Sequence, residues 1–122
     1  MTKERQKLGR EGEELAKRFL LSKGYKIVKR NFRTSFGEID IIAYQKRVLV
    51  FIEVRTKTSF NFGTPEESIS LNKKKKISRV ASFYLKAKRL NEVDCRFDVV
   101  CITLDKENSY TIKLFKDAFQ IC

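Results

Sequence analysis

The sequence predicts an α/β fold built on one mixed β-sheet. Two stretches carry apolar residues at helical spacing, and five short stretches are rich in Val, Ile and Phe. One helical stretch separates the third strand from the fourth, and strands on both sides of a crossover helix imply mixed pairing. The chain has 122 residues, 42% of them hydrophobic. That is the size of one ordinary domain, so we expect a single domain over residues 1–122.

The first helix is predicted from about Thr2 to Lys23, because its apolar residues fall on one helical face and Gly24 ends the pattern. A second helix follows a loop, and Ser70 or Asn72 is suited to cap its first turn. The strands are predicted over residues 25–33, 37–44, 47–56, 96–104 and 110–115. The last of them is expected at an edge of the sheet, and residues 57–68 are expected to form a loop.

The charge of the chain points to a polyanionic partner. Twenty-seven Lys and Arg against fifteen Asp and Glu leave a net charge of +12. Nucleic acid is the first candidate and an anionic membrane surface the second. No apolar run is long enough to span a bilayer, no secretory signal is visible, and the three cysteines lack metal-site spacing. We therefore expect a cytoplasmic protein with reduced thiols. Since the chain has no histidine, any chemistry must use carboxylates, lysines, tyrosines, thiols or a metal.

A hairpin between the second and third strands carries the candidate site. If its turn is the two-residue Lys46-Arg47, then Asp40 lies opposite Glu53. Directly opposed side chains have Cβ atoms about 5 Å apart, and like charges there destabilise a sheet. Two acids held together in this way invite a divalent cation between them.

Alternation along the strands adds further groups to each acid. Glu38 shares a face with Asp40, while Arg55 and Lys57 share a face with Glu53. Paired acids beside a basic residue suit metal-assisted attack on a phosphodiester, in which a cation activates water and offsets charge on the phosphate. The alternative is a solvated hairpin end with cross-strand ion pairs, for instance Glu53 with Lys57.

The motifs "GEIDIIA" and "FIEVR", with thirteen residues from Asp40 to Glu53, resemble the signatures of the PD-(D/E)XK nuclease superfamily. The likeness is greatest to its small YraN-like branch, related to archaeal Holliday-junction resolvases. It extends through "GREGEELAKRFLLSKGYKIVKRNFR", "FGTPEESI", "KKKKISRVASFYL" and "RFDVVCI". The resemblance implies a restriction-endonuclease-like three-layer fold, with a central mixed sheet flanked by helices, and metal-dependent cleavage of DNA, with branched or damaged DNA as a candidate substrate.

The resemblance also implies roles for individual residues. Glu13, Asp40 and Glu53 would hold Mg²⁺ or Mn²⁺, with the Val54 carbonyl as a further ligand. Arg55 or Lys57 would then orient water or phosphate. Junction-cleaving relatives commonly dimerise, which makes a homodimer an option for this chain.

One position departs from the family pattern, which has lysine where this chain has Arg55. Arginine keeps the charge but does not give up a proton in a protein. Lys57 or Lys73 could take the place of that lysine. The alternative function is a non-catalytic nucleic-acid-binding or adaptor protein that retains the nuclease fold.

Further candidates are open to two interpretations. Asp98, among apolar residues, is either a buried structural acid or a catalytic group. Phe60 and Phe62 could stack on bases, or cover an edge of the core. Three lysines near the start of the second helix are candidates to bind phosphate, or belong to a solvated helix face: Lys73, Lys74 and Lys76.

Overall fold

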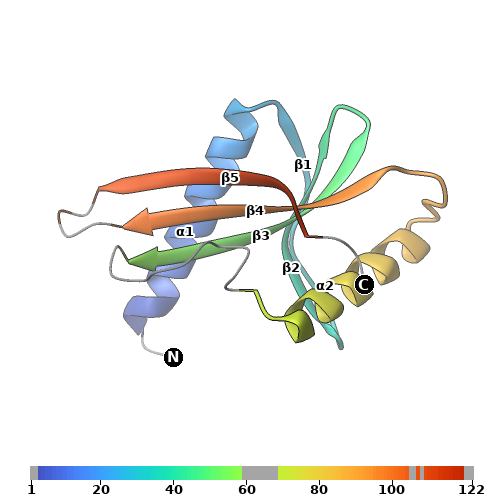
Figure 1. Ribbon diagram of the computed structural model, residues 1–122, viewed down its shortest axis with the longest axis horizontal. Coiled ribbons are helices and arrows are strands. Elements are labelled where there is room, and N and C mark those ends of the chain that lie inside the picture. Colours follow the sequence, from blue (N-terminus) through green and yellow to red (C-terminus); the bar gives the residue numbers. More distant parts are fainter. Residues whose placement is uncertain (1–2, 59–68, 105–106, 108, 120–122) are drawn as a thin grey trace.

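The structure is a computed structural model that describes residues 3–58, 69–104, 107 and 109–119. These residues form two helices and five strands (Figure 1). In chain order they are α1 (Lys3–Ser22), β1 (Tyr25–Thr34), β2 (Gly37–Gln45), β3 (Val48–Thr58), α2 (Leu71–Ala87), β4 (Cys95–Leu104) and β5 (Tyr110–Phe119). Phe60 and Phe62 lie outside the described residues.

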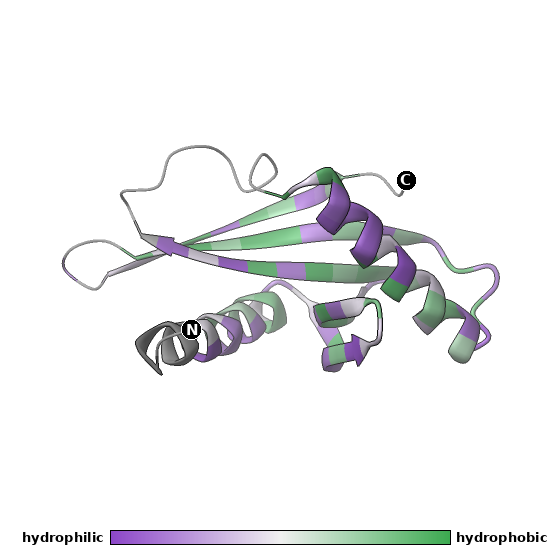
Figure 2. Cartoon of the chain, turned by 90° about the horizontal axis from the view of Figure 1, so that it is seen from below, coloured by the Kyte–Doolittle hydropathy of each residue, from purple (hydrophilic) through white to green (hydrophobic). Residues whose placement is uncertain are grey.

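The strands form one mixed sheet in the order β1-β2-β3-β4-β5. Only β3 and β4, which the α2 crossover connects, pair in parallel; the other neighbours are antiparallel. Helices α1 and α2 cover opposite faces of the sheet (Figures 1 and 2). The three layers of helix, mixed sheet and helix are those predicted for a restriction-endonuclease-like fold. Neither described helix combines the length and apolarity needed to cross a membrane.

Burial on both faces explains the apolar run at the start of β3. Val50 and Ile52 pack on the α1 side, whereas Leu49 and Phe51 pack on the α2 side. A strand buried on both faces is apolar at every position rather than at every second one. Full burial of a side chain such as Phe51 stabilises the fold by roughly 1.5–3 kcal/mol.

Each helix begins or ends close to the predicted residue. Helix α1 stops at Ser22, and Gly24 follows with a φ of 87°, a left-handed conformation that glycine adopts without steric cost. Helix α2 starts after Ser70, whose hydroxyl oxygen accepts a hydrogen bond of 3.1 Å from the Lys73 N–H. Of the two predicted caps, Ser70 is therefore the one used.

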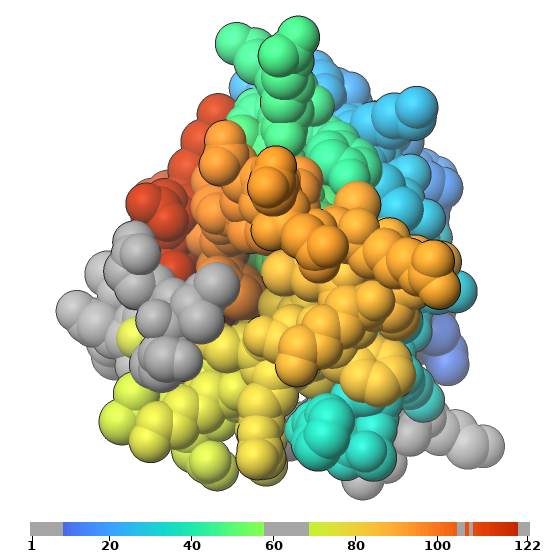
Figure 3. All heavy atoms as spheres, turned by 90° about the vertical axis from the view of Figure 1, so that its right-hand side faces the viewer, coloured from blue at the N-terminus to red at the C-terminus, as the bar shows by residue number. Residues whose placement is uncertain are grey.

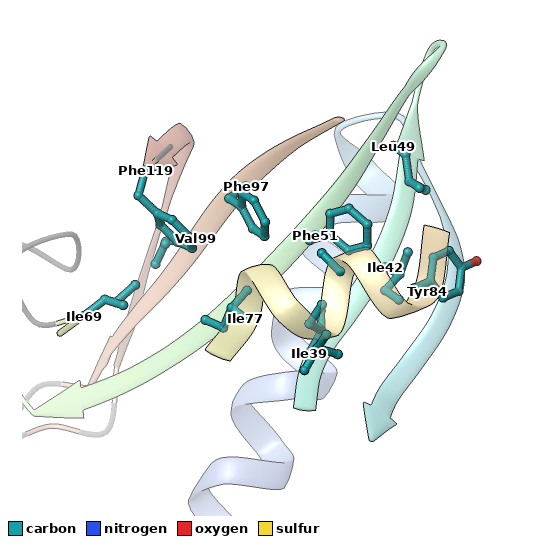
Figure 4. Close-up of a cluster of buried hydrophobic side chains, with 12 residues drawn as sticks. Ile39, Ile42, Leu49, Phe51, Ile69, Ile77, Tyr84, Phe97, Val99 and Phe119 are labelled. Atoms are coloured by element: carbon teal, nitrogen blue, oxygen red, sulfur yellow. The ribbon is translucent and has the colours of Figure 1, made fainter. Parts of the chain in front are cut away.

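The turn between β1 and β2 lies beside the first half of α2 (Figure 3, teal beside yellow). A methyl group placed at Gly37 would lie 3.8 Å from Val80 Cγ2 and 4.0 Å from Lys76 Cβ. Further along, the α2 core side chains Ile77 and Tyr84 pack with Ile39 and Ile42 of β2 (Figure 4). The start of the β2–β3 hairpin is thus held against α2.

Two strands end two or more residues beyond their predicted last residue. Strand β3 continues through Thr58 because it pairs in parallel with β4 as far as Leu104, so Lys57 lies in a strand and not in the predicted loop. Strand β5 is at an edge, as predicted, but runs to Phe119 instead of Phe115. A register shift near Asp117, which has a φ of 52°, lets it continue as a bulged strand.

Candidate functional site

The candidate site lies where β2 and β3 separate. Their pairing runs from Gln45–Val48 to Ile41–Ile52, which is the predicted register. Asp40 and Glu53 are the first residues beyond the last pair of this register, and the charge of Glu53 acts on Asp40. Beyond this point Asp40 Oδ2 accepts a hydrogen bond of 2.8 Å from the Val54 N–H. The side chain thus binds a backbone group that a strand partner would otherwise satisfy.

The surroundings of Asp40 disfavour its negative charge. Burial and the Glu53 carboxylate raise the pKa of Asp40 to about 8, with smaller contributions from Glu13 and Glu38. The hydrogen bond from Val54 acts in the opposite direction and lowers the pKa. The acids around Asp40 and its burial therefore outweigh the hydrogen bond that stabilises its carboxylate.

Glu53 is buried on the α2 side of β3 and has a cationic partner. Its Oε1 lies 2.9 Å from Nζ of Lys73, a residue of the first turn of α2. The Ser70 cap fixes the start of that turn and with it the position from which Lys73 reaches the sheet. This partner of Glu53 thus comes from a helix in another layer of the fold.

Glu13 reaches the site because α1 lies directly on β3. Gly12 is buried, and a methyl group at this position would collide with Oγ1 of Thr56. The absence of a side chain therefore lets α1 approach the strand closely enough for the charge of Glu13 to act on Asp40. Gly12, Ala16 and Leu20 are spaced four residues apart and therefore lie on one face of α1. This spacing is the sequence signal that could have identified Gly12 as the contact with the sheet.

The remaining predicted catalytic residues lie further along β3. Side chains along β3 point alternately to the two faces of the sheet, and Val54 packs on the α1 side. Arg55 and Lys57 therefore lie on the α2 side, as Glu53 does. Both side chains are half-buried. Glu38, which precedes this group on β2, is exposed and forms a cross-strand ion pair of 2.7 Å with Arg33. Glu38 is therefore a surface acid with a cross-strand partner on β1.

The three lysines predicted to bind phosphate have separate environments. Lys73 pairs with Glu53, and Lys74 lies over the ring of Phe119 at 5.8 Å from its centroid. Lys76 is exposed and lines a groove beside the β1–β2 turn. Since successive helical residues point in directions about 100° apart, a run of lysines does not make one surface.

Asp98 is a structural acid, in line with the first of its two interpretations. It is fully buried on β4. Its carboxylate accepts hydrogen bonds from the Tyr25 hydroxyl, the Arg96 guanidinium and the Asp117 N–H. Arg96 also donates to Gln45. These bonds connect the β1 and β2 ends of the sheet to β4 and β5, and they satisfy a charge that would otherwise be costly to bury.

No three Asp, Glu or Cys side chains among the described residues converge closely enough to hold a metal ion as they stand. The side-chain arrangement instead pairs Glu53 with Lys73 and Asp40 with the Val54 backbone. What the structure brings together is a pair of acids, a third acid from α1 acting on Asp40, and a lysine from α2.

Comparison with known sequences identifies relatives over nearly the whole chain. A UPF0102 protein of Moorella thermoacetica is 43% identical, over 98% of this chain and 100% of the relative. UPF0102 proteins of Chlorobium limicola (47% identical, 92% of this chain and 91% of the relative) and Clostridium botulinum (44%, 93% and 94%) are similar to the same extent. Residues 12–102, which include the candidate site, match the uncharacterised protein family UPF0102. With a family match over most of its length and relatives this similar, the chain belongs to the UPF0102 family.

Proposed function

We propose that this protein binds DNA and hydrolyses its phosphodiester bonds as a divalent-metal-dependent endonuclease. The observation that carries the proposal is that two acids, Asp40 and Glu53, follow the last pair of the β2–β3 hairpin and that the charge of Glu53 acts on Asp40. Burial and like charge raise the pKa of Asp40 to about 8, and carboxyl groups perturbed in this way cluster at functional sites.

The donor set suits Mg²⁺ or Mn²⁺. Asp40, Glu53 and Glu13 offer carboxylate oxygens, the hard ligands that such cations take. The N–H and C=O of a strand residue point to the same neighbouring strand, so the Val54 carbonyl faces the gap that Asp40 occupies. When bound, the cation would activate a water molecule and offset the charge that develops on the phosphate.

Lys73 is the residue best placed to supply an ammonium group. It neutralises Glu53 in the structure described here, at 2.9 Å. If the Glu53 carboxylate binds a metal cation, it no longer needs the Lys73 ammonium as its partner. The ammonium then lies beside the bound cation, where it can orient water or hold a phosphate oxygen. Arg55 is permanently charged and suits a phosphate clamp, but it does not transfer a proton. Lys57 is the other lysine on that side of β3.

A second candidate function is DNA binding without cleavage. Arg55, which stands where related nucleases have lysine, is the observation that favours it. The two functions share the fold and the positive charge and differ only in whether the acid pair supports hydrolysis.

One nuclease assay separates the two functions. The parent, Glu53→Ala, Lys73→Met, Lys57→Ala and Arg55→Lys are incubated with branched, single-stranded and duplex DNA in the presence of Mg²⁺ or Mn²⁺. We expect the parent to cleave and Glu53→Ala to be inactive. Lys73→Met should lower the rate by about 10²-fold or more, as for loss of a positioned acid–base group.

The outcomes assign the role of each cation. A large loss in Lys57→Ala, with Lys73→Met unchanged, would give the role to Lys57. A gain of cleavage only in Arg55→Lys would mean that the natural arginine has silenced the site. Absence of cleavage by both the parent and Arg55→Lys, on every form of DNA, would favour binding alone.

A further inference from the structure

A basic groove runs along α2, beside the candidate site and outside it. Its volume is about 690 Å³, and its walls are the outward side of α2 and the turn between β1 and β2. Figure 3 shows this turn in teal against the yellow and orange helix. Four cations line the groove, and none of the described residues that line it is acidic. They are Lys75, Lys76, Arg79 and Lys86.

The groove combines these charges with exposed aromatic rings. Phe36 in the turn is 43% exposed, and Phe83 on the helix is 48% exposed. Arg79 lies over the ring of Phe36, with its guanidinium carbon 5.3 Å from the ring centroid. An arginine stacked in this way keeps its N–H edge available for a phosphate.

The spacing on α2 places the groups in one line. Lys76, Arg79, Phe83 and Lys86 follow one another at intervals of three, four and three residues, so they share one face of the helix. At 1.5 Å per residue, the line from Lys76 to Lys86 is about 15 Å long.

A buried polar group in the groove lining has no partner among the described residues. Ser78 is only 6% exposed, and its hydroxyl makes no hydrogen bond there. The hydroxyl oxygen has almost no accessible surface, so it costs the fold free energy and is not a contact for a ligand in the groove.

Both walls of the groove contain residues that are close in sequence to the candidate site. Asn72 lines the groove and precedes Lys73, the partner of Glu53. Phe36 is four residues before Asp40 and in the turn that opens β2. The same helix and the same turn thus contribute to the groove and to the candidate site.

We propose that this groove binds single-stranded DNA, with its phosphates on Lys76, Arg79 and Lys86 and its bases on Phe36 and Phe83. The identity of the polymer rests on the proposed function. Duplex DNA would use the cations but not the rings, because only unpaired bases present a face for stacking. The groove thus selects unpaired DNA next to the site.

The test measures binding in EDTA, where no cleavage takes place. Fluorescence anisotropy with a single-stranded oligonucleotide and with a duplex of the same sequence is compared for the parent, Phe36→Leu and Phe83→Leu. We expect each variant to bind the single strand about 5- to 100-fold more weakly, the range for loss of one base–aromatic stack, with duplex binding changed less than about twofold. Tyr110→Leu is the matched control, since Tyr110 is an exposed aromatic residue on β5 outside the groove, and it should bind like the parent.

A second pair of variants keeps the test decisive if Phe83→Leu fails to fold. Lys76→Gln and Lys86→Gln remove one groove cation each, and each should reduce the salt slope for single-stranded DNA by about 0.7. Parent-like single-strand binding by Phe36→Leu and Phe83→Leu, or equal losses for single strand and duplex, would overturn the proposal. So would tighter binding of polyglutamate or anionic vesicles than of single-stranded DNA. An inactive nuclease would leave these results unchanged, so failure of the proposed function is seen separately.

Discussion

At the scale of single residues, three main effects act on the carboxyl group of Asp40, and one of them opposes the other two. Burial and the neighbouring Glu53 favour its neutral form, while the Val54 N–H favours the carboxylate. The first two effects are larger, and the pKa rises from 3.8 to about 8. The same features that make Asp40 a good ligand for a cation make it a poor contributor to stability without one.

We therefore predict that Asp40→Asn does not destabilise the metal-free protein. Between pH 4 and pH 8 the folded parent binds more protons at residue 40 than the unfolded chain does, because the pKa is about 8 in one and 3.8 in the other. Stability from this group is present at low pH and is lost as the pH rises through that window. The melting temperature of Asp40→Asn minus that of the parent should thus increase from pH 5 to pH 8 in EDTA.

The same melting curves provide a control and a metal response. Glu92→Gln changes an exposed acid away from the site, and its difference from the parent should not increase in this way. Mg²⁺ or Mn²⁺ should raise the melting temperature of the parent and not that of Asp40→Asn. A marked loss of stability in metal-free Asp40→Asn would show instead that the fold needs the carboxylate.

Lys73 leads to a second prediction at this scale. Lys73→Met removes the ammonium group from a buried Glu53 whose charge also acts on Asp40. Because the lysine side chain is 42% exposed, the loss should be moderate, about 1–2 kcal/mol in urea denaturation of the metal-free protein. Mn²⁺ should restore part of it, since the cation supplies the missing positive charge.

Lys75→Met is the matched control for Lys73→Met. Lys75 is exposed on the same helix, so its replacement should change the free energy of unfolding by less than about 0.5 kcal/mol. Equal effects of the two variants would mean that the Lys73–Glu53 pair does not support the metal-free fold.

At the scale of elements, the contact between α1 and β3 decides whether Glu13 belongs to the site. The helix rests on Thr56 at Gly12, where no side chain fits. Any larger residue must push α1 away from the sheet or displace the Thr56 side chain. The acid from α1 would then lie further from Asp40.

Two glycines of the same helix should respond in opposite ways to alanine. Gly12→Ala should destabilise by about 1–3 kcal/mol, as expected for overpacking. Gly9→Ala should stabilise by up to about 1 kcal/mol, because nothing lies within 4 Å of a methyl group there and alanine is the better helix former. Urea denaturation of both variants measures the difference.

A double-mutant cycle with Thr56→Ala tests the cause. This change removes the atom that the new methyl group would meet, so Gly12→Ala should cost less in its presence. Strictly additive effects would place the damage somewhere other than at this contact.

At the scale of the whole molecule, the net charge of +12 dominates association with a polyanion. If about five phosphates are contacted, the logarithm of the duplex binding constant should fall against the logarithm of salt concentration with a slope of about −4 to −5. Anisotropy titrations from low to physiological ionic strength measure this slope. Binding that does not change with salt would exclude a mainly electrostatic mode.

Much of the fold could be predicted from local sequence. The apolar spacing, Gly24 and Ser70 located both helices to within a few residues. The helix between β3 and β4 implied mixed pairing, and these two strands do pair in parallel. The additional length of β5 was missed, because a bulge that depends on the hydrogen bond from Asp117 to Asp98 has no local signature.

The sequence by itself determined the register of the β2–β3 hairpin, because a two-residue turn sets it, and this register leaves Asp40 and Glu53 directly beyond its last pair. Only the tertiary structure decided what surrounds the pair. The link from Lys73 to Glu53 joins residues twenty apart in different layers, and the approach of α1 at Gly12 depends on a side chain of β3. Such contacts depend on how the layers pack, and a local pattern carries no information about the distance between layers.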